Sequence, residues 1–269
     1  MATRIEEKFK YLKTKNKKAL VCFLTAGDPN KKISAEVLSL LPRSGADLIE
    51  IGIPFSDPMA DGPTIQRSSL RAIKSGINLK QILEMVRDFR KNDSRTPIIL
   101  MGYFNPIFQY GLKNFFIDSS KSGVDGIIAV DLPPEENGLI YDYSKKFNID
   151  IIRLLTPTTD LERLKKILKS TSGFLYYVSI MGITGTKKPS IALVKKSVKK
   201  IKQLTSLPVV VGFGINNSKQ VEEINKFSDG CVIGSALVKI LEGYQMRKFN
   251  HKEMKKRVNI FLSKINKAC

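Results

Sequence analysis

The segment DLIEIGIPFSDPMADGP, residues 47–63, joins a short apolar run to a loop rich in proline and glycine. Residues 47–52 are typical of a buried strand, and the following prolines and glycines exclude regular structure for residues 53–63. Glu50 is therefore expected at the C-terminal end of a strand, with Asp57 and Asp61 on the loop after it. In an α/β barrel, this end of the strands carries the chemistry.

The rest of the chain repeats this pattern of an apolar run followed by an amphipathic stretch. The expected strands are residues 19–25, 47–51, 98–102, 126–130, 151–155, 174–179, 209–212 and 231–233. The expected helices are residues 32–41, 79–91, 111–121, 135–146, 161–169, 191–204 and 219–226, with another beginning near Pro63. Apolar strands that alternate with helices indicate a parallel sheet covered on both faces. We predict a single (β/α)8 TIM barrel domain over residues 1–269, with an extra N-terminal helix at 6–15 and additional helices at 236–244 and 252–267.

Composition is ordinary for a globular protein, with 42% hydrophobic and 26% charged residues. No apolar run is long enough for a transmembrane helix, and the N-terminus lacks the apolar block of a signal peptide. Three widely spaced cysteines fit a reducing cytoplasm, with Cys22 and Cys231 expected as core thiols, and the single histidine, His251, argues against a metal site.

The formal net charge of +20 raises the possibility of a nucleic-acid partner. The lysines fall mainly on the expected outer helices, and no aromatic residues accompany them in a stripe. We therefore interpret the charge as a solvated surface and expect neither a nucleic-acid nor a membrane partner.

Glycine-bearing turns follow the last two expected strands. Gly212 and Gly214 end one strand, and Gly234 and Ser235 open a short helix after the other. Glycines let a backbone approach a ligand closely, and free N–H groups at a helix start bind anions. With Gly185 from the loop at 181–190, which we expect to act as a lid, these turns predict a phosphate site.

Two carboxylates are the candidates for acid–base chemistry opposite the phosphate site. Burial among apolar side chains is expected to raise the pKa of Glu50 toward neutrality, which suits proton transfer, although a structural pair with lysine is an alternative. Asp61 is held between glycine and proline, and it is either a positioned carboxylate or merely a helix cap. Tyr176 is either a hydroxyl near Glu50 or a core residue.

Together these segments resemble the tryptophan synthase α subunit family over the whole chain. The resemblance rests on FLTAGDP (23–29), EIGIPFSDPMADGP (50–63), LMGYFNPI (100–107), AVDLPPEE (129–136), SIMGITG (179–185), VGFGI (211–215) and IGSA (233–236). It implies retro-aldol cleavage of indole-3-glycerol phosphate to indole and glyceraldehyde 3-phosphate, without a cofactor in this chain. Residues 180 and 181 are Ile and Met, where some members carry charged or small polar residues, which affects the lid and not the reaction.

The resemblance also implies residue roles. Glu50 is the general acid and base, Asp61 binds the indole N–H, Tyr176 helps to hold Glu50 and the substrate in place, and Thr184 bonds Asp61 when the lid closes. The implied ring-binding residues are Phe23, Leu24, Met101, Ile128, Phe213 and Ile233. The implied phosphate-binding residues are Gly185, Gly214, Gly234 and Ser235. The family works as an αββα complex whose β subunit holds pyridoxal phosphate and receives indole. The residues implied to face that partner are Asp57, Pro58, Asn105, Phe108 and Pro133.

Three other functions are weighed against this lyase. Indole-glycerol-phosphate synthase needs a catalytic lysine inside its barrel, but the lysines here fall on expected helices and loops. A non-catalytic subunit would have lost a carboxylate, whereas Glu50 and Asp61 are both present. A basic RNA-binding protein would show salt-dependent retention on a polynucleotide column.

Overall fold

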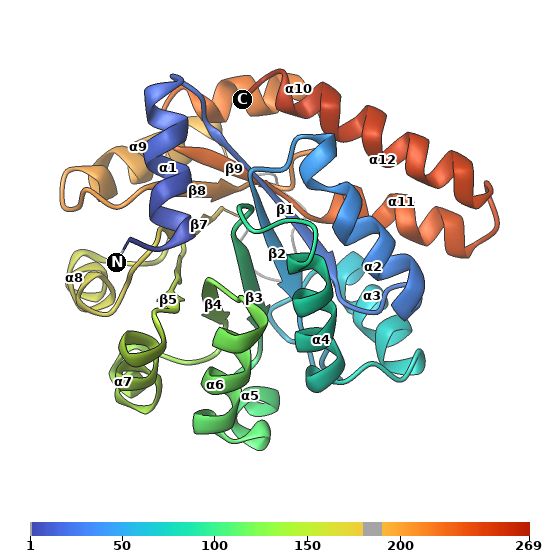
Figure 1. Ribbon diagram of the computed structural model, residues 1–269. Coiled ribbons are helices and arrows are strands. Elements are labelled where there is room, and N and C mark those ends of the chain that lie inside the picture. The colour runs from blue at the N-terminus through green and yellow to red at the C-terminus, as the bar shows by residue number, and fades with distance from the viewer. Residues whose placement is uncertain (1, 180–189) are drawn as a thin grey trace.

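Parallel β-strands form one sheet that curls into a nearly closed barrel in the computed structural model, which describes residues 2–179 and 190–269 (Figure 1). The strand order is β5-β4-β3-β2-β1-β9-β8-β7-β6. The strands are β1 Ala19–Thr25, β2 Leu48–Gly52, β3 Ile98–Gly102, β4 Gly126–Ala129, β5 Asp150–Ile151, β6 Arg153–Leu155, β7 Leu175–Val178, β8 Val209–Gly212 and β9 Gly230–Ile233. The predicted α/β barrel is confirmed.

The two short strands β5 and β6 are halves of the single strand expected at 151–155. Only Ile152 separates them, and its N–H donates to the carbonyl of Ile127 on β4 at 3.0 Å. Since β5 pairs with β4 and β6 pairs with β7, the chain itself links the two ends of the sheet. The eight-strand pattern read from the sequence therefore describes the barrel.

Helices surround the barrel on its outside (Figure 1). They are α1 Arg4–Thr14, α2 Lys31–Leu40, α3 Pro63–Lys74, α4 Leu79–Arg90, α5 Phe104–Tyr110, α6 Leu112–Ser122, α7 Gly138–Phe147, α8 Leu161–Lys169, α9 Ile191–Lys202, α10 Ser218–Asn225, α11 Ser235–Gln245 and α12 His251–Asn266, with 3-10 turns η1 Pro42–Ser44 and η2 Pro134–Glu136. Asn30, Asn78, Asn217 and Asn250 cap four of them through side-chain oxygens, which satisfies N–H groups that the helix leaves free.

One helix was not expected. The sequence predicted no helix over residues 104–110, but α5 spans Phe104–Tyr110, so Asn105 and Phe108, two residues expected to face the partner, are helical. Pro106 lies in the first turn, where the missing N–H of proline costs no intrahelical hydrogen bond. The proline that made this segment look irregular is compatible with a helix start.

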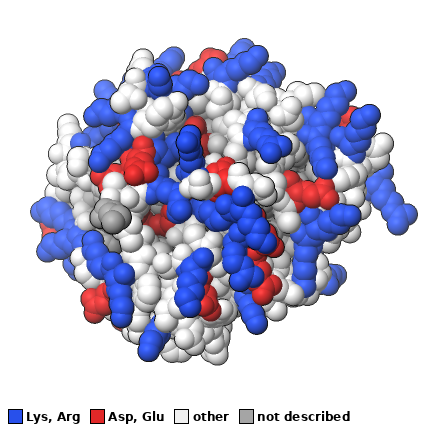
Figure 2. Space-filling model, viewed as in Figure 1, with Lys and Arg blue, Asp and Glu red and all other residues white. Residues whose placement is uncertain are grey.

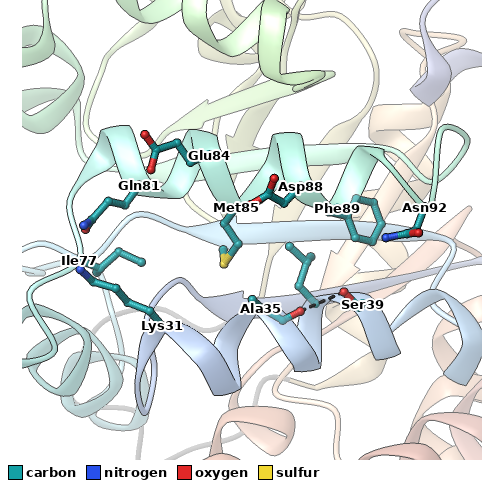
Figure 3. Close-up of a pocket in the computed structure, with 11 residues that line it drawn as sticks. Lys31, Ala35, Ser39, Ile77, Gln81, Glu84, Met85, Asp88, Phe89 and Asn92 are labelled. Atoms are coloured by element: carbon teal, nitrogen blue, oxygen red, sulfur yellow. Dashed lines mark hydrogen bonds between the residues drawn. The ribbon is translucent and has the colours of Figure 1, made fainter.

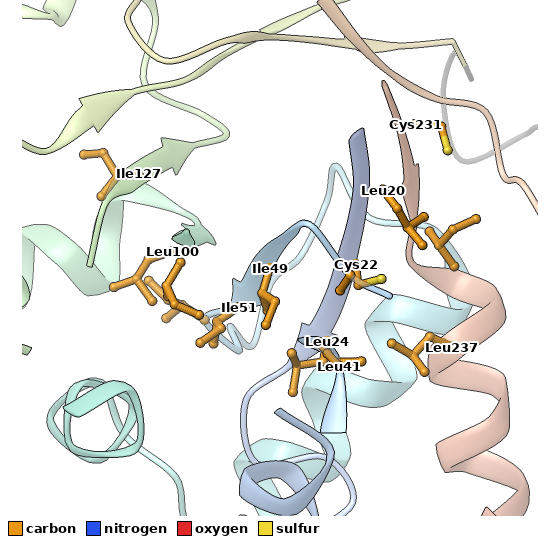
Figure 4. Packing of buried hydrophobic residues seen from close by; sticks show 14 of the residues in the cluster. Leu20, Cys22, Leu24, Leu41, Ile49, Ile51, Leu100, Ile127, Cys231 and Leu237 are labelled. Atoms are coloured by element: carbon orange, nitrogen blue, oxygen red, sulfur yellow. The ribbon is translucent and has the colours of Figure 1, made fainter. Parts of the chain in front are cut away.

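Strand alternation divides the buried side chains into two sets, because successive side chains point to opposite faces of a sheet. The inner core, inside the barrel, contains Ile5, Phe9, Leu12, Ala19, Val21, Leu48, Ile99, Ile128, Ile152, Phe174, Val210 and Val232. The outer core fills the space between strands and helices and includes Leu20, Cys22, Leu24, Ile49, Ile51, Leu100, Cys231 and Ile233 (Figure 4). Helix α1 closes the bottom of the barrel, where Phe9 packs against Phe174 with ring centroids 5.7 Å apart.

Aspartates hold the N-terminal ends of the strands together. Asp47, Asp125 and Asp229 each immediately precede a strand, and each accepts a hydrogen bond from an N–H of a neighbouring strand, at 3.0, 2.7 and 2.9 Å respectively. Asp125 also binds Arg4 and Arg90, both at 2.7 Å. These carboxylates therefore have partners.

Basic side chains cover the face of the molecule drawn in Figure 2, with acidic ones between them rather than in a separate patch. Among the helices of the described residues, none has the length and apolarity needed to cross a membrane.

Candidate active site

The side chain of Glu50 lies inside the barrel, near the C-terminal ends of the strands. Leu48, two residues earlier on β2, belongs to the inner core, and alternation turns Glu50 to the same side. Glu50 is completely buried, and neither carboxylate oxygen has a hydrogen-bond partner among the described residues. The alternative of a Glu–Lys pair therefore does not hold within that part of the chain.

Burial without a partner changes the chemistry of this carboxyl. Desolvation disfavours the charged form and raises the pKa of Glu50 to about 8. The group is then mostly a neutral acid at pH 7 and can donate a proton. Perturbation of this kind is typical of a catalytic acid or base.

Asp61 is on the loop after β2 and is not a helix cap, because Gly62 occupies the N-cap position of α3. Burial raises the pKa of Asp61 to about 6, while a hydrogen bond from Tyr103 acts in the opposite direction. The pKa still leaves most of the carboxyl ionised at pH 7. Two acidic groups therefore differ in protonation at the same pH, which is the arrangement that acid–base enzymes use.

Tyr176 on β7 lies close enough to both carboxyls to feel their charges. Its ring packs over Gly212 of β8, where a Cβ atom would come within 2.7 Å of the ring. Burial, and then the charges of Glu50 and Asp61, raise the pKa of Tyr176 well above its ordinary value. Both carboxyls are thus within electrostatic range of one neutral phenol, and the structure brings the three predicted catalytic residues together.

Tyr103 is a further residue of this site that the sequence interpretation missed. Its hydroxyl accepts a hydrogen bond from the Ala60 N–H at 2.8 Å and lies 3.5 Å from an Asp61 carboxylate oxygen. Its ring packs against Phe55 with centroids 5.1 Å apart, and burial raises its pKa to about 12. Tyr103 therefore fixes the loop that carries Asp61. Its position directly after a predicted strand was the available signal.

Three of the six residues expected to bind the ring face the interior of the barrel. Phe23, Ile128 and Met101 point into the barrel, and the Phe23 ring lies so close to Gly52 that a Cβ there would be 2.5 Å away. Leu24 and Ile233 do not line this space. Both belong to the outer core, and Figure 4 places Leu24 beside Leu41.

The expectation for Leu24 and Ile233 is wrong because each is one residue out of phase with the inward-facing positions. On β9 the residue that faces inward is Val232. Phe213 lies just beyond the end of β8, is 5% exposed and packs against the outer core, so its contact with a ring stays a prediction.

The predicted phosphate site lies at the ends of neighbouring strands, because β8 pairs with β9. Gly214 has a φ of +62°, which favours glycine, and it is exposed. Gly234 is the N-cap of α11 and makes no side-chain cap bond, so the first N–H groups of α11 are available to an anion. Thr184, Gly185 and the expected lid at 181–190, apart from Ser190, lie outside the described residues.

Most of the expected partner-facing residues are on the surface. Asp57, Asn105, Phe108 and Pro133 are exposed and Pro58 is partly exposed, with Phe108 at 55%. No group of three or more His, Cys, Asp or Glu side chains placed to bind a metal occurs within residues 2–179 and 190–269.

A separate surface groove of about 420 Å³ lies between α2 and α4 (Figure 3). Its lining includes Ile77, Met85 and Phe89, with Glu84 and Asp88 along the α4 side. None of the predicted site residues lines it. Its walls are the outer helices, so we do not associate it with the chemistry of the barrel.

The fold and the site define an α/β barrel with two acidic side chains near the C-terminal ends of its strands, the end at which barrel enzymes carry their chemistry. Comparison with known proteins makes this specific. The family model described as tryptophan synthase alpha chain matches residues 9–269.

Solved structures agree with the family model. Tryptophan synthase subunit alpha of Legionella pneumophila is 39% identical with a TM-score of 0.91, covering 100% of this chain and 98% of that one. A protein of Aquifex aeolicus is 36% identical with a TM-score of 0.89 and 99% coverage of both chains. A chain of tryptophan synthase from Mycobacterium tuberculosis, in an aminoacrylate-bound form, is 29% identical with a TM-score of 0.87 and 99% coverage of both.

This chain belongs to the tryptophan synthase α chain family. Its reaction is the lyase reaction of that family, cleavage of indole-3-glycerol phosphate to indole and glyceraldehyde 3-phosphate. The function predicted from the sequence is confirmed.

Proposed function

We propose that Glu50 is the general acid and base of this cleavage. As a buried neutral acid it protonates C3 of the indole ring, which turns the ring into an electron sink. The resulting carboxylate takes the proton of the adjacent glycerol hydroxyl. That oxygen forms the aldehyde carbonyl, and the electrons of the breaking carbon–carbon bond return to the ring. The single observation that carries this role is a fully buried carboxyl without a partner among the described residues.

Asp61 is proposed to bind the indole N–H and to stabilise the positive charge that protonation places on the ring. A pKa of about 6 keeps it mostly ionised at pH 7, when Glu50 is mostly protonated. An anionic group placed where positive charge develops stabilises the transition state and so lowers the activation free energy of the cleavage. Tyr176 is proposed to help hold Glu50 and the substrate in place, and Thr184 to bond Asp61 on lid closure.

The substrate is proposed to lie with its ring against Phe23, Met101, Ile128 and Phe213, with Val232 completing the slot. Its phosphate is proposed to bind at Gly214, Gly234 and Ser235, with Gly185 contributing from the loop. An anchor at one end and a ring slot at the other fix the reacting bond between the carboxyls, which lowers the entropic cost of the reaction.

The proposed partner is a tryptophan synthase β subunit, in an αββα assembly. Exposed Asp57, Asn105, Phe108 and Pro133, with partly exposed Pro58, would face it, and indole would pass to it for L-tryptophan synthesis. The β subunit is expected to hold pyridoxal phosphate, while this chain acts as a single catalytic domain without a cofactor of its own. Free thiols at Cys22, Cys231 and Cys269 support a cytoplasmic location.

An indole-release assay on indole-3-glycerol phosphate, with and without a β subunit, tests this proposal. The chain should release indole alone and faster with the partner. Glu50→Gln should reduce release by at least about 10³-fold, because it removes the proton donor, while binding of a phosphate-bearing product analogue survives. Normal turnover by Glu50→Gln would refute the assignment of the acid.

A further inference from the structure

Arg153 places a positive charge inside an apolar strand. It lies in the run IIRLL and is 5% exposed. Its neighbours Ile152 and Leu154 contribute to the inner core, so alternation turns Arg153 outward, toward the layer between the sheet and the helices. The mechanism proposed above does not use this residue.

The guanidinium of Arg153 binds two points of one loop. Nη1 donates to the carbonyl oxygen of Leu132 at 2.6 Å, and Nη2 donates to Oδ1 of Asn137 at 2.5 Å. Leu132 and Asn137 are buried, whereas Pro133, Glu135 and Glu136 between them are exposed. One planar group therefore holds both ends of an exposed segment, residues 133–136.

The same segment is fixed from its other side. Asp131, one residue before Leu132, accepts a hydrogen bond from the Phe104 N–H at 2.7 Å, at the start of α5. The segment is thus tied to the helix that carries Asn105 and Phe108, two of the residues expected to face the β subunit. The exposed residues of segment 133–136 therefore adjoin the surface proposed to face the β subunit.

Burying the charged guanidinium of Arg153 at this position costs free energy of folding. No carboxylate pairs with it within the described residues, and its Nε has no hydrogen-bond partner there. Glu135 is an acidic residue whose charge acts on the guanidinium of Arg153. Its carboxylate already binds Arg163 at 2.5 Å and Lys166 at 3.8 Å. A well-packed apolar residue would generally be at least as stabilising at such a position. What a guanidinium adds is two donors in a rigid planar fork.

We propose that Arg153 is a positioning residue that sets the shape of segment 133–136 for the β subunit. The segment presents an exposed proline and the carboxylate of Glu136, which has no ion pair among the described residues, and this suits a partner surface with a basic group. Beside segment 133–136 lies a surface pocket of about 400 Å³ lined by Pro134, Tyr141 and Lys169 among others. This inference rests on the proposed function, because it takes the β subunit as the occupant.

Three variants test the role of Arg153. Arg153→Met removes both hydrogen bonds, and Arg153→Lys replaces the planar fork with a single ammonium group. Asn137→Asp leaves the arginine in place and gives it a carboxylate partner. Arg43→Met, at an exposed arginine of η1, is the matched control.

The readouts are basal indole release, melting temperature, and the β-subunit concentration that gives half-maximal stimulation. Arg153→Met should raise that concentration about tenfold, equivalent to about 1.4 kcal/mol, with basal release within about twofold of the parent. For Arg153→Lys, the half-maximal β-subunit concentration should lie between those of the parent and Arg153→Met. Asn137→Asp should bind the β subunit at least as tightly as the parent. Arg43→Met should change nothing.

Unchanged half-saturation in Arg153→Met would overturn the positioning role, and so would equal losses of basal release and β-subunit binding. If that variant fails to fold, Asn137→Leu, which removes one of the two bonds, should show the same selective loss of affinity. A parent chain that releases no indole, or that no β subunit stimulates, would instead refute the proposed function itself.

Discussion

The two ends of the barrel use buried carboxylates in opposite ways. At the N-terminal ends of the strands, Asp125 accepts a backbone N–H and binds Arg4 and Arg90. At the C-terminal ends, Glu50 is more deeply buried and has no partner among the described residues. A paired carboxylate is stable but chemically inert, whereas an unpaired one is costly and reactive. The difference separates the residues that hold the barrel together from those that do its chemistry.

The pH dependence of stability should show this contrast most strongly. Glu50 has an ordinary pKa of 4.5 when unfolded and about 8 when folded, so the folded state binds more protons between these values. Stability should therefore fall as pH rises from about 5 to 8. By pH 8 the loss relative to Glu50→Gln should be on the order of 4 kcal/mol. Urea unfolding of both proteins at several pH values measures it, and parallel curves would contradict the elevated pKa.

At the opposite end, Asp125→Asn should destabilise the fold by about 3 kcal/mol, because it leaves Arg90 buried without a countercharge. Turnover per folded molecule should not change. Urea unfolding and the indole assay report the two effects separately. Asp88→Asn, which breaks an exposed pair with Lys91, is the control and should leave stability nearly unchanged. An equal effect of both substitutions would remove the distinction between the ends.

Asp61→Asn should slow indole release by about 100-fold, since it keeps the shape but removes the charge that stabilises the protonated ring. Stability should not fall, because the ionised group is partly buried and lacks a cation. The measurement is kcat with the melting temperature as control. An Asp61→Asn variant with unchanged kcat would leave Glu50 as the sole carboxyl required.

Tyr103→Phe should have the smallest effect, about 1 kcal/mol or fivefold in rate, through loss of one hydrogen bond to the Asp61 loop. The Tyr103 hydroxyl lowers the pKa of Asp61, so its removal should move the acidic limb of the pH–rate profile to higher pH. Tyr110→Phe, which loses a 2.7 Å bond to Asp118 away from the site, is the matched control. A shift of the acidic limb in the opposite direction would contradict this role.

The sequence was sufficient to predict the barrel and the two carboxylates, because apolar runs, turn residues and the position of Glu50 are local features. It did not reveal which side of each strand faces the barrel. In runs such as LVCFL (20–24) and CVI (231–233), every residue is apolar, so no alternation is visible. The family resemblance implied Leu24 and Ile233 as ring-binding residues, and no alternation in these two runs could correct that expectation.

The remaining differences depend on contacts between distant segments. Tyr103 matters because of where the loop at Ala60 folds, which no local pattern encodes. Arg153 is visible in the sequence as a single cation within an apolar strand. Its role could not be predicted, because it depends on hydrogen bonds to Leu132 and Asn137. Helix α5 was missed because a proline in a first turn resembles a loop in sequence.

Helix α1, which closes the bottom of the barrel, also constrains the order in which the chain folds. Thr3 bonds to Asp150, 147 residues away, and Phe9 packs against Phe174. During synthesis, this segment therefore cannot reach its final neighbours until residues 150 and 174 have also left the ribosome. Such long-range closure adds little entropic cost per extra residue but slows the search. Until then Ile5, Phe9 and Leu12 of helix α1 stay uncovered, and exposed apolar side chains of this kind favour aggregation.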